Sequence, residues 1–487
     1  MTIGLSSFQN STAGMSGFGI GSQQDIANLQ KALEAGYQTS GQTGGSALRV
    51  ESLEASLKVL TYTSSHIKLW KKIPKSPAYS TVEEYNQLTT YGGSQNPFLQ
   101  EGELPQATDT SYVRQVQLVK FLGTVREVTH QASLVHPAHG DLIALENQSG
   151  ILWLLEQVER NLFQGDSSLA FDGEAEQWDG LDSLIDSAQV IDMEGNTLQE
   201  ADIEEGANEI IENYGFPTDM FLGTRTMSDL VKTFYPRERI ALPAPQNGQV
   251  GQSIQTISTQ AGVIEFNPDV FIRKNPSPPS AATSANAPAT PSLAGTPPAA
   301  AATGTGDFTK GEVAPGADNY FNYVVTACNR FGESAPSAVS ASVSLSQANR
   351  TAGHSITVTI TNNATIGAFA PEYFRVYRTS AMASDLDPAT MSSYSLIAQV
   401  PATSQTGGAT GATYSDVNLV LPFTSTAYLG ELTPSVLTFR QLMPMMKMDL
   451  AVLSPAFRWM ILLYGTPILF APKKWLRFIN VGQLEVR

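Results

Sequence analysis

The sequence predicts an α+β chain that carries an additional all-β sandwich. Apolar residues recur at three- and four-residue spacing over 50–60 and 141–164, which predicts amphipathic helices beside the Val- and Thr-rich strands of 81–131. From 306 to 425, short alternating segments follow one another with Gly- and Pro-containing turns, which indicates the sandwich. At 487 residues the chain is long enough for two or three domains, each with its own core.

The first 131 residues predict an arm followed by an extended excursion. Residues 1–46 are rich in Gly, Ser, Thr and Gln and predict an arm with one short helix over 25–35. The amphipathic helix over 50–60 is expected to pack its apolar side against another part of the protein or against a neighbouring copy. Residues 81–131 combine helix breakers, a polar turn and a Val-rich segment, which predicts a hairpin-like ribbon. Because a lone two-stranded ribbon is marginally stable in water, it needs a partner surface.

Three helices are expected after the ribbon. The clearest covers 141–164, with Asp141 as its N-cap and an apolar stripe along one side. A second spans about 203–214. A third begins at Thr226, where Asp229 three residues later completes a pattern like a capping box.

A change of composition marks the start of the all-β part. Residues 276–305 are dominated by Pro, Ala, Ser and Thr, and predict a linker that cannot bury enough apolar area to fold. Beyond it, apolar and polar residues alternate with a period of two. The expected strands include 321–327, 356–360, 373–379, 394–400 and 413–419.

Charge and cysteine usage narrow the class of protein. The chain has a net charge of -16. Residues 161–224 contain sixteen Asp and Glu and no Lys or Arg, so this window alone has a charge equal to that of the whole chain. Such acidity does not suit tight nucleic-acid binding, which depends on neutralising phosphates. We interpret the window as a solvated face, with repulsion of DNA or docking of a basic partner as alternatives. The single cysteine, Cys328, cannot form an internal disulfide, so packing or neighbouring copies must supply stability.

Neither export nor a membrane helix is expected. The N-terminal stretch MTIGLSSFQNSTAGMSGFGIG has no basic cluster and no apolar core, so we expect no signal peptide. The most apolar stretch, 451–472, contains Pro455, Arg458 and Pro467, which argues against a membrane span. Its Trp459 and Tyr464, with Trp475 just after it, are expected in a core rather than in a ligand cleft.

One resemblance to a known family covers about 47–275 and 426–487. The segment EGELPQATDTSYVRQVQLVKFLGTVREVTHQASLV, the long helix after it and ERNLFQGD resemble the extended loop, spine helix and following turn of tailed-phage major capsid proteins of the Hong Kong 97 type. The resemblance implies the following division: 1–46 N-terminal arm; 47–80 and 131–185 peripheral domain with spine helix; 81–130 extended loop; 186–275 and 426–487 axial domain and closing strands; 276–305 linker; 306–425 inserted sandwich.

A second resemblance lies inside the expected sandwich. YFNYVVTACNRFGESAPSAVSASVSL resembles the last two strands of fibronectin type III or similar immunoglobulin-like modules, and YFRVYRT resembles a middle strand. The order departs from the family, because the segment that resembles the last strands comes first. The module is therefore either circularly permuted or made of parts of two modules. Insertion is tolerated because the termini of a domain often lie close together.

Together the resemblances imply a structural protein and not an enzyme. They imply a major capsid protein that self-assembles through hexamers and pentamers into an icosahedral head shell around phage DNA, with the sandwich outside. Assembly in the host bacterial cytoplasm, no cofactor, no membrane and no sequence-specific DNA binding are expected, with portal, scaffold and decoration proteins as further partners. The expected inter-subunit contact residues are Glu101, Gly102, Glu103, Leu104, Pro105, Val116, Leu118 and Phe121.

Other interpretations were weighed. His130, His136 and His139 match no known metal-site spacing, so we expect surface histidines and no metal site. No nucleophile or phosphate-binding motif is present in the sequence, which argues against an enzyme. An adhesin that binds surfaces through its sandwich is the alternative function. Five lysines could contact DNA or an acidic neighbouring copy: Lys58, Lys68, Lys71, Lys72 and Lys75.

Overall fold

The fold is that of a computed structural model. It describes residues 61–93, 96, 98–104, 107–135, 140–171, 174–175, 177–238, 254–272, 276–313, 315–362, 369–404, 410–451 and 454–484. By internal packing the chain divides into two units, 1–60 with 135–142 and 61–134 with 143–487, and the elements below belong to the second, apart from Leu142 at the start of one helix. The predicted arm over 1–46 and the predicted helix over 50–60 lie outside the described residues.

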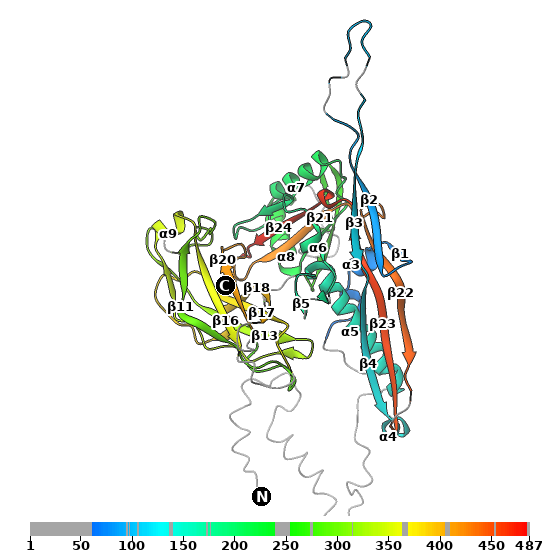
Figure 1. The fold of residues 1–487 in the computed structure, drawn as a ribbon, viewed down its shortest axis with the longest axis vertical. Coiled ribbons are helices and arrows are strands. Elements are labelled where there is room, and N and C mark those ends of the chain that lie inside the picture. Colours follow the sequence, from blue (N-terminus) through cyan, green and yellow to red (C-terminus); the bar gives the residue numbers. More distant parts are fainter. Residues whose placement is uncertain are drawn as a thin grey trace, which may run out of the picture. The chain divides into compact units, whose positions relative to one another are not determined.

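A four-stranded sheet, here called the long sheet, carries a long helix on one face. Its strands in order are β1 (Lys75–Pro77), β22 (Leu437–Asp449), β23 (Ala456–Leu469) and β4 (Lys120–Thr129). Helix α5 (Leu142–Gln164) runs along this sheet (Figure 1). A Cβ on Gly150 would lie 2.7 Å from Cδ1 of Ile461, so the glycine permits the close approach. The helix predicted over 141–164 is confirmed.

Strands β2 (Val82–Thr90) and β3 (Ser111–Leu118) form an antiparallel two-stranded ribbon. The register runs from Val82 opposite Leu118 to Thr90 opposite Ser111, and Figure 1 shows the two strands side by side. The predicted ribbon is therefore confirmed for part of 81–131. After Val119, which is buried and donates its N–H to Thr81 O at 2.9 Å, the chain leaves the ribbon and joins the long sheet as β4.

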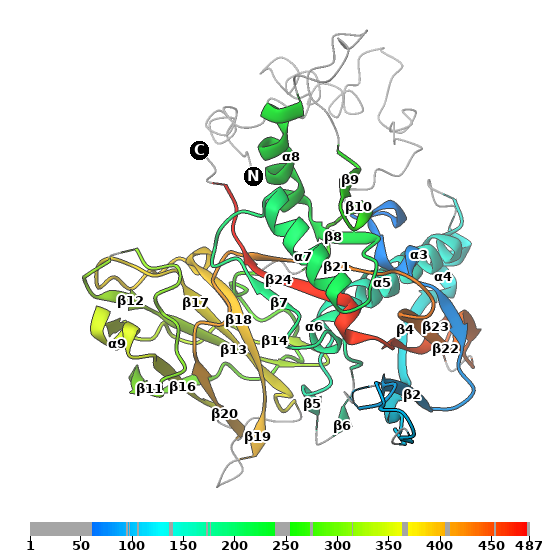
Figure 2. The ribbon, with the colours of Figure 1, turned by 90° about the horizontal axis from the view of Figure 1, so that it is seen from above.

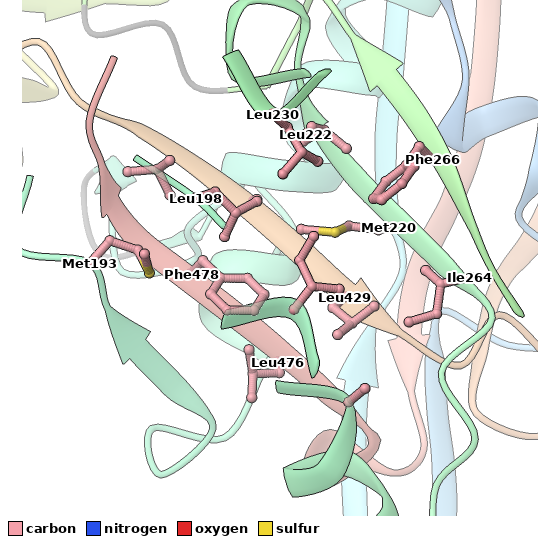
Figure 3. Packing of buried hydrophobic residues seen from close by; sticks show 14 of the residues in the cluster. Met193, Leu198, Met220, Leu222, Leu230, Ile264, Phe266, Leu429, Leu476 and Phe478 are labelled. Carbon is pink, nitrogen blue, oxygen red and sulfur yellow. The ribbon is translucent and has the colours of Figure 1, made fainter. Parts of the chain in front are cut away.

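A six-stranded sheet builds the second layer. Its strands in order are β7 (Val190–Asp192), β24 (Trp475–Val481), β21 (Ser425–Gly430), β8 (Asp219–Gly223), β10 (Gly262–Asp269) and β9 (Thr256–Thr259). Helices α7 (Glu200–Glu212) and α8 (Thr224–Glu238) lie beside these strands in Figure 2. Both helices contribute to one apolar core, in which Met220, Leu429 and Phe478 meet (Figure 3).

The other face of the six-stranded sheet meets the end of α5. The ring of Phe163 stacks on Tyr428 at 5.2 Å and lies 6.0 Å from Phe221. Because alternate residues of a strand point to opposite faces, Phe221 faces α5 while its neighbour Met220 faces α7 and α8. One helix therefore packs on both the long sheet and the six-stranded sheet.

The expected capping box at the start of α8 is wrong. The helix begins at Thr224, two residues earlier than predicted, and Thr226 is buried inside its first turn. Asp229 accepts a hydrogen bond from Lys232 and, through its other oxygen, from the backbone N–H of Leu484. The carboxylate is therefore used for a contact with the distant C-terminal segment.

The all-β part consists of two sheets around a shared core, as the alternating pattern predicts. One sheet has the order β11 (Ser292–Ala302), β16 (His354–Asn362), β20 (Thr410–Asp416), β19 (Thr403–Ser404); the other has β14 (Gly332–Glu333), β13 (Tyr323–Asn329), β17 (Tyr373–Thr379), β18 (Tyr394–Pro401). Strands β12 (Asn319–Phe321) and β15 (Val343–Leu345) pair beside them. Val325, Val358 and Phe374 meet in the core.

The prediction of an unfolded linker over 276–305 is wrong. Residues Ser292–Ala302 form β11, which pairs antiparallel with β16. Upstream of it, Thr283 donates its N–H to Glu333 O at 2.9 Å. A segment poor in large apolar residues folds here because a neighbouring strand supplies both the hydrogen-bond partners and most of the apolar area. The sandwich therefore begins before residue 306.

Short elements complete the described chain. They are η2 (Ser64–His66), α3 (Leu69–Lys72), α4 (His130–Leu134), β5 (Ala170–Phe171), β6 (Glu174–Ala175), α6 (Leu181–Leu184), α9 (Gln347–Thr351), η3 (Met391–Ser393) and η4 (Pro472–Lys474).

Candidate assembly surface

The base of the ribbon is anchored on the long sheet. The ring of Tyr85 meets that of Phe470 edge-on, with 5.0 Å between centroids. Gln87 donates its side-chain amide to Phe470 O at 2.6 Å. Both contacts involve β2, so they fix the direction in which this strand of the ribbon leaves the body.

The ribbon beyond its base exposes large apolar side chains. Phe98 is 84% exposed and Leu104 is 89% exposed. Tyr91 and Tyr112 are exposed as well. A run of exposed apolar side chains on a narrow ribbon is typical of a surface that another molecule covers.

The predicted contact residues fall into three places. Glu101, Gly102, Glu103 and Leu104 lie at the ribbon tip, where Glu103 N–H donates to Gln100 O at 3.1 Å and Gly102 has a φ of 90°. Such a φ favours glycine and closes the turn. Pro105 lies outside the described residues. Val116 and Leu118 are half-exposed on β3, and Phe121 belongs to β4 in the long sheet.

The long sheet has one face against α5 and one uncovered apolar face among the described residues. Cross-strand pairs put three rows on the uncovered face: Met448, Met460 and Val125; Met446, Leu462 and Gly123; Met443, Tyr464 and Phe121. Phe121 is 60% exposed and Val125 is 59% exposed. On the opposite face Trp459, Ile461 and Leu463 are buried. The expected core role is confirmed for Trp459 and Trp475 but wrong for Tyr464, which is half-buried in the row with Phe121. We call these three rows the outer face.

The sequence interpretation named Phe121 but missed the rest of the outer face. The signal was present as alternate apolar residues in QLMPMMKMD and FRWMILLY. Only the pairing of β22 and β23 with β4, far apart in the sequence, shows that these residues share one surface. Gly123 contributes by leaving room for Leu462, whose Cδ2 lies 2.6 Å from where a Cβ would stand.

Among the described residues, the cysteine is buried and no metal-binding group of side chains occurs. Cys328 is buried in β13, and burial raises the pKa of its thiol to about 12, so the thiolate that reacts as a nucleophile is not formed at neutral pH. No group of three metal-binding side chains occurs among the described residues; His136 and His139 lie outside them. None of the described helices is long and apolar enough to cross a membrane.

The lysines left open between DNA and a neighbouring copy are partly used within the chain. Lys72 Nζ lies 2.8 Å from carboxylate oxygens of both Asp219 and Glu265. Lys75 donates to Trp70 O at 2.8 Å, with its ammonium over the Trp70 ring. Lys72 therefore ties the segment after η2 to the six-stranded sheet, whereas the contacts of Lys75 stay within the segment; Lys58 lies outside the described residues.

Comparison with known proteins adds independent information. The chain matches the family model of the SU10 major capsid protein over residues 34–313. The proteins named major capsid protein from Staphylococcus phage S25-3 and Staphylococcus phage K are each 27% identical to it over 480 residues, covering 95% of this chain and 96% of theirs. At this coverage the matches extend across the residues of the sandwich.

A solved structure described as the capsid of a native GTA particle is 5% identical, covers 91% of this chain and 99% of its own, and has a TM-score of 0.45. Because this TM-score is below 0.5, the structural similarity is not used to assign the family. The assignment depends on the sequence matches. The family model spans more than half of the residues. The chain belongs to the SU10 major capsid protein family.

Proposed function

We propose that this chain is the shell-forming subunit of a tailed-phage head. Many copies assemble through hexamers and pentamers into an icosahedral shell around DNA, and each ribbon lies on the outer face of an adjacent copy. Family membership supports the shell. The proposed contact between ribbon and outer face is supported by the exposure of Phe98 and Leu104 near the ribbon tip and by the exposed apolar side chains of the outer face.

Burial of these side chains would make assembly favourable. A large apolar side chain that becomes fully buried contributes about 1.5–3 kcal/mol. Phe98, Leu104 and Tyr112 on one copy, with Phe121 and Val125 on the next, can therefore offset an association cost of at least several kcal/mol. Because every copy carries both surfaces, the contact repeats around a ring.

We infer that the sandwich is an immunoglobulin-like or fibronectin type III-like module on the outside of the shell. Its two sheets and shared core support the module type. Lys310 joins it to the six-stranded sheet, since its Nζ lies 2.9 Å from Asp192 and 2.8 Å from Asp307. The family match does not favour the alternative of an adhesin.

The remaining partners follow from the same proposal. Portal, scaffold and decoration proteins would contact the shell, which would assemble in the host cytoplasm. The enclosed DNA would be held without sequence recognition. The acidic window 161–224 supports this, because exposed carboxylates such as Glu204 and Glu205 repel phosphates.

Electron microscopy of the purified full chain tests the proposal. Uniform shells are expected from the wild type. The double variant Phe98→Glu, Leu104→Glu should give free subunits or small oligomers, since it puts two charges into the proposed contact. Leu386→Glu changes an exposed apolar residue of the sandwich and should leave shells intact. Wild-type chain that stays monomeric under all conditions would refute the proposal.

A further inference from the structure

Methionine is concentrated on the outer face of the long sheet. Five of the twelve methionines of the chain fall within 443–460. Four of them occupy positions in the three rows of the outer face: Met443, Met446, Met448 and Met460. Met446 is 40% exposed and Met448 is 41% exposed. Leucine, isoleucine or valine would make the surface equally apolar, so apolarity alone does not explain the choice of methionine.

Methionine differs from the other large aliphatic residues in its flexibility. Its side chain is unbranched, rotates about three bonds and contains a polarisable thioether, so it fits surfaces of different shape. Binding proteins that accept more than one partner use flexible, methionine-rich surfaces that repack around each of them. The outer face therefore has the chemistry of a surface that adapts to whatever covers it.

The backbone beneath these side chains is irregular as well. The register of β22 against β23 shifts between Gln441 and Met443, and again between Met443 and Met446. Pro444 lies between these two methionines and has no N–H to donate to the sheet. By contrast, β4 pairs with β23 along its whole length without a shift. The irregularity therefore falls on the strand that carries three of the four methionines.

Charge complementarity indicates that the ribbon tip, residues 91–110, is what covers this face. The tip contains Glu101, Glu103 and Asp109 and no Lys or Arg. Strands β4, β22 and β23 together contain five Lys and Arg and two Asp and Glu. The apolar side chains of the tip can therefore meet the methionines while the opposite charges of tip and sheet attract each other.

The tip that covers the outer face comes from a second copy. Strand β3 continues into β4 after the single residue Val119, so the tip and the outer face lie at opposite ends of one extended segment (Figure 1). At the tip, Phe98 donates its N–H to Asn96 Oδ1 at 3.1 Å, and Glu103 donates its N–H to Gln100 O at 3.1 Å. These contacts are local, so the tip can turn relative to the body without breaking them.

A shell with both pentamers and hexamers needs one contact that works in two geometries. Every copy has the same sequence, but neighbours in a ring of five meet at a different angle from neighbours in a ring of six. A surface of stiff, branched side chains would favour one angle, because close packing is sensitive to small changes of shape. A surface of methionines can repack instead.

We propose that the four methionines of the outer face form an adaptable binding surface, which accepts the ribbon tip of a neighbouring copy in one arrangement in hexamers and in another in pentamers. This inference deepens the proposed function and rests on it. The buried face of the same sheet, which includes Trp459, Ile461 and Leu463, keeps a single arrangement in both rings.

High-resolution electron microscopy of wild-type shells tests the inference without any variant. The side-chain torsion angles of Met446 and Met448 should differ between pentamers and hexamers, whereas those of Trp459 and Leu463 should agree. Identical methionine conformations under a tip that is bound in both rings would overturn the adaptable surface and leave the proposed function standing. A tip bound away from the outer face, or the absence of shells, would overturn both.

Replacing all four methionines of the outer face with leucine tests the consequence for assembly. Leucine conserves volume and apolarity, so the subunit should still fold. Because leucine is branched and less flexible, it should favour one arrangement of the tip over the other. The yield of closed shells, counted by electron microscopy, should fall severalfold, with open sheets or tubes of hexamers in their place.

The matched control replaces four methionines outside the outer face with leucine: Met193, Met227, Met382 and Met391. The first two pack in the core of the six-stranded sheet, and the last packs in the sandwich. This variant should yield closed shells as the wild type does, and circular dichroism shows whether each variant is folded. A wild-type yield of closed shells from the folded outer-face variant would overturn the proposal.

Discussion

At the residue scale, the sandwich is organised around a buried cation. Arg378 donates to the carboxylate of Asp416 and lies 5.3 Å from the ring centroid of Phe308 and 5.4 Å from that of Phe321. The Tyr323 hydroxyl donates to the same carboxylate at 2.8 Å. The charges of Arg378 and Asp416 therefore compensate each other inside the protein, and removal of either side chain would leave the other charge buried without its partner.

Replacing Arg378 with Met should destabilise the sandwich by roughly 3–5 kcal/mol, because Asp416 would become a buried anion without its cation. Thermal unfolding and limited proteolysis measure the loss. Arg330→Met is the control: its guanidinium is largely exposed and lies 3.8 Å from Glu372, a geometry worth about 0–1 kcal/mol. Equal effects from the two variants would show that the buried pair has no special role.

A second residue-scale prediction concerns the contact of α5 with the long sheet. Gly150→Val should lower stability by about 1–3 kcal/mol, since its side chain would collide with Ile461 and Arg126. Ser149→Val, an exposed neighbour on the same helix, should have a much smaller effect. Urea unfolding of both variants checks this. An unchanged midpoint for Gly150→Val would mean that the helix moves away from the sheet without cost.

At the element scale, the periodicity of apolar residues predicted the helices and strands whose pattern can be recognised within one segment of the sequence. The stripe of α5 and the alternation of β13, β16 and β17 were sufficient to find those elements. The sequence could not reveal β11, because Ala- and Pro-rich residues become a strand only beside β16. The same reason hid most of the outer face. The position of the ribbon tip could be predicted, because the polar turn EGELPQATD is recognisable in the sequence without knowledge of a pairing partner.

An element-scale prediction concerns the joint between the sandwich and the six-stranded sheet. Burial opposes the charge of Lys310, but the hydrogen bonds that it donates to Asp307 and Asp192 outweigh this effect and raise the lysine pKa. The ion pair should therefore persist at pH 9. Lys310→Met should speed proteolysis between residues 303 and 316 severalfold at neutral pH and at pH 9. An unchanged cleavage rate would show that other contacts hold the sandwich.

At the scale of the whole molecule, the sandwich should be dispensable for assembly. The deletion must remove 276–422, since β11 belongs to the sandwich and β21 already belongs to the six-stranded sheet. With a short linker, the remaining chain should still form shells visible by electron microscopy. Folded but unassembled protein would show instead that the sandwich takes part in the contacts between copies.

The contact between ribbon and outer face is tested most directly by cross-linking in assembled particles. A photoreactive label on Leu104→Cys avoids the native thiol, because Cys328 is buried. Shells assembled from a mixture of light and isotopically heavy chains distinguish cross-links between copies from those within one copy. Mixed-isotope cross-links from position 104 to peptides that contain 121–129 or 446–448 are predicted. Cross-links confined to single chains, or directed only to other surfaces, would contradict the proposed contact.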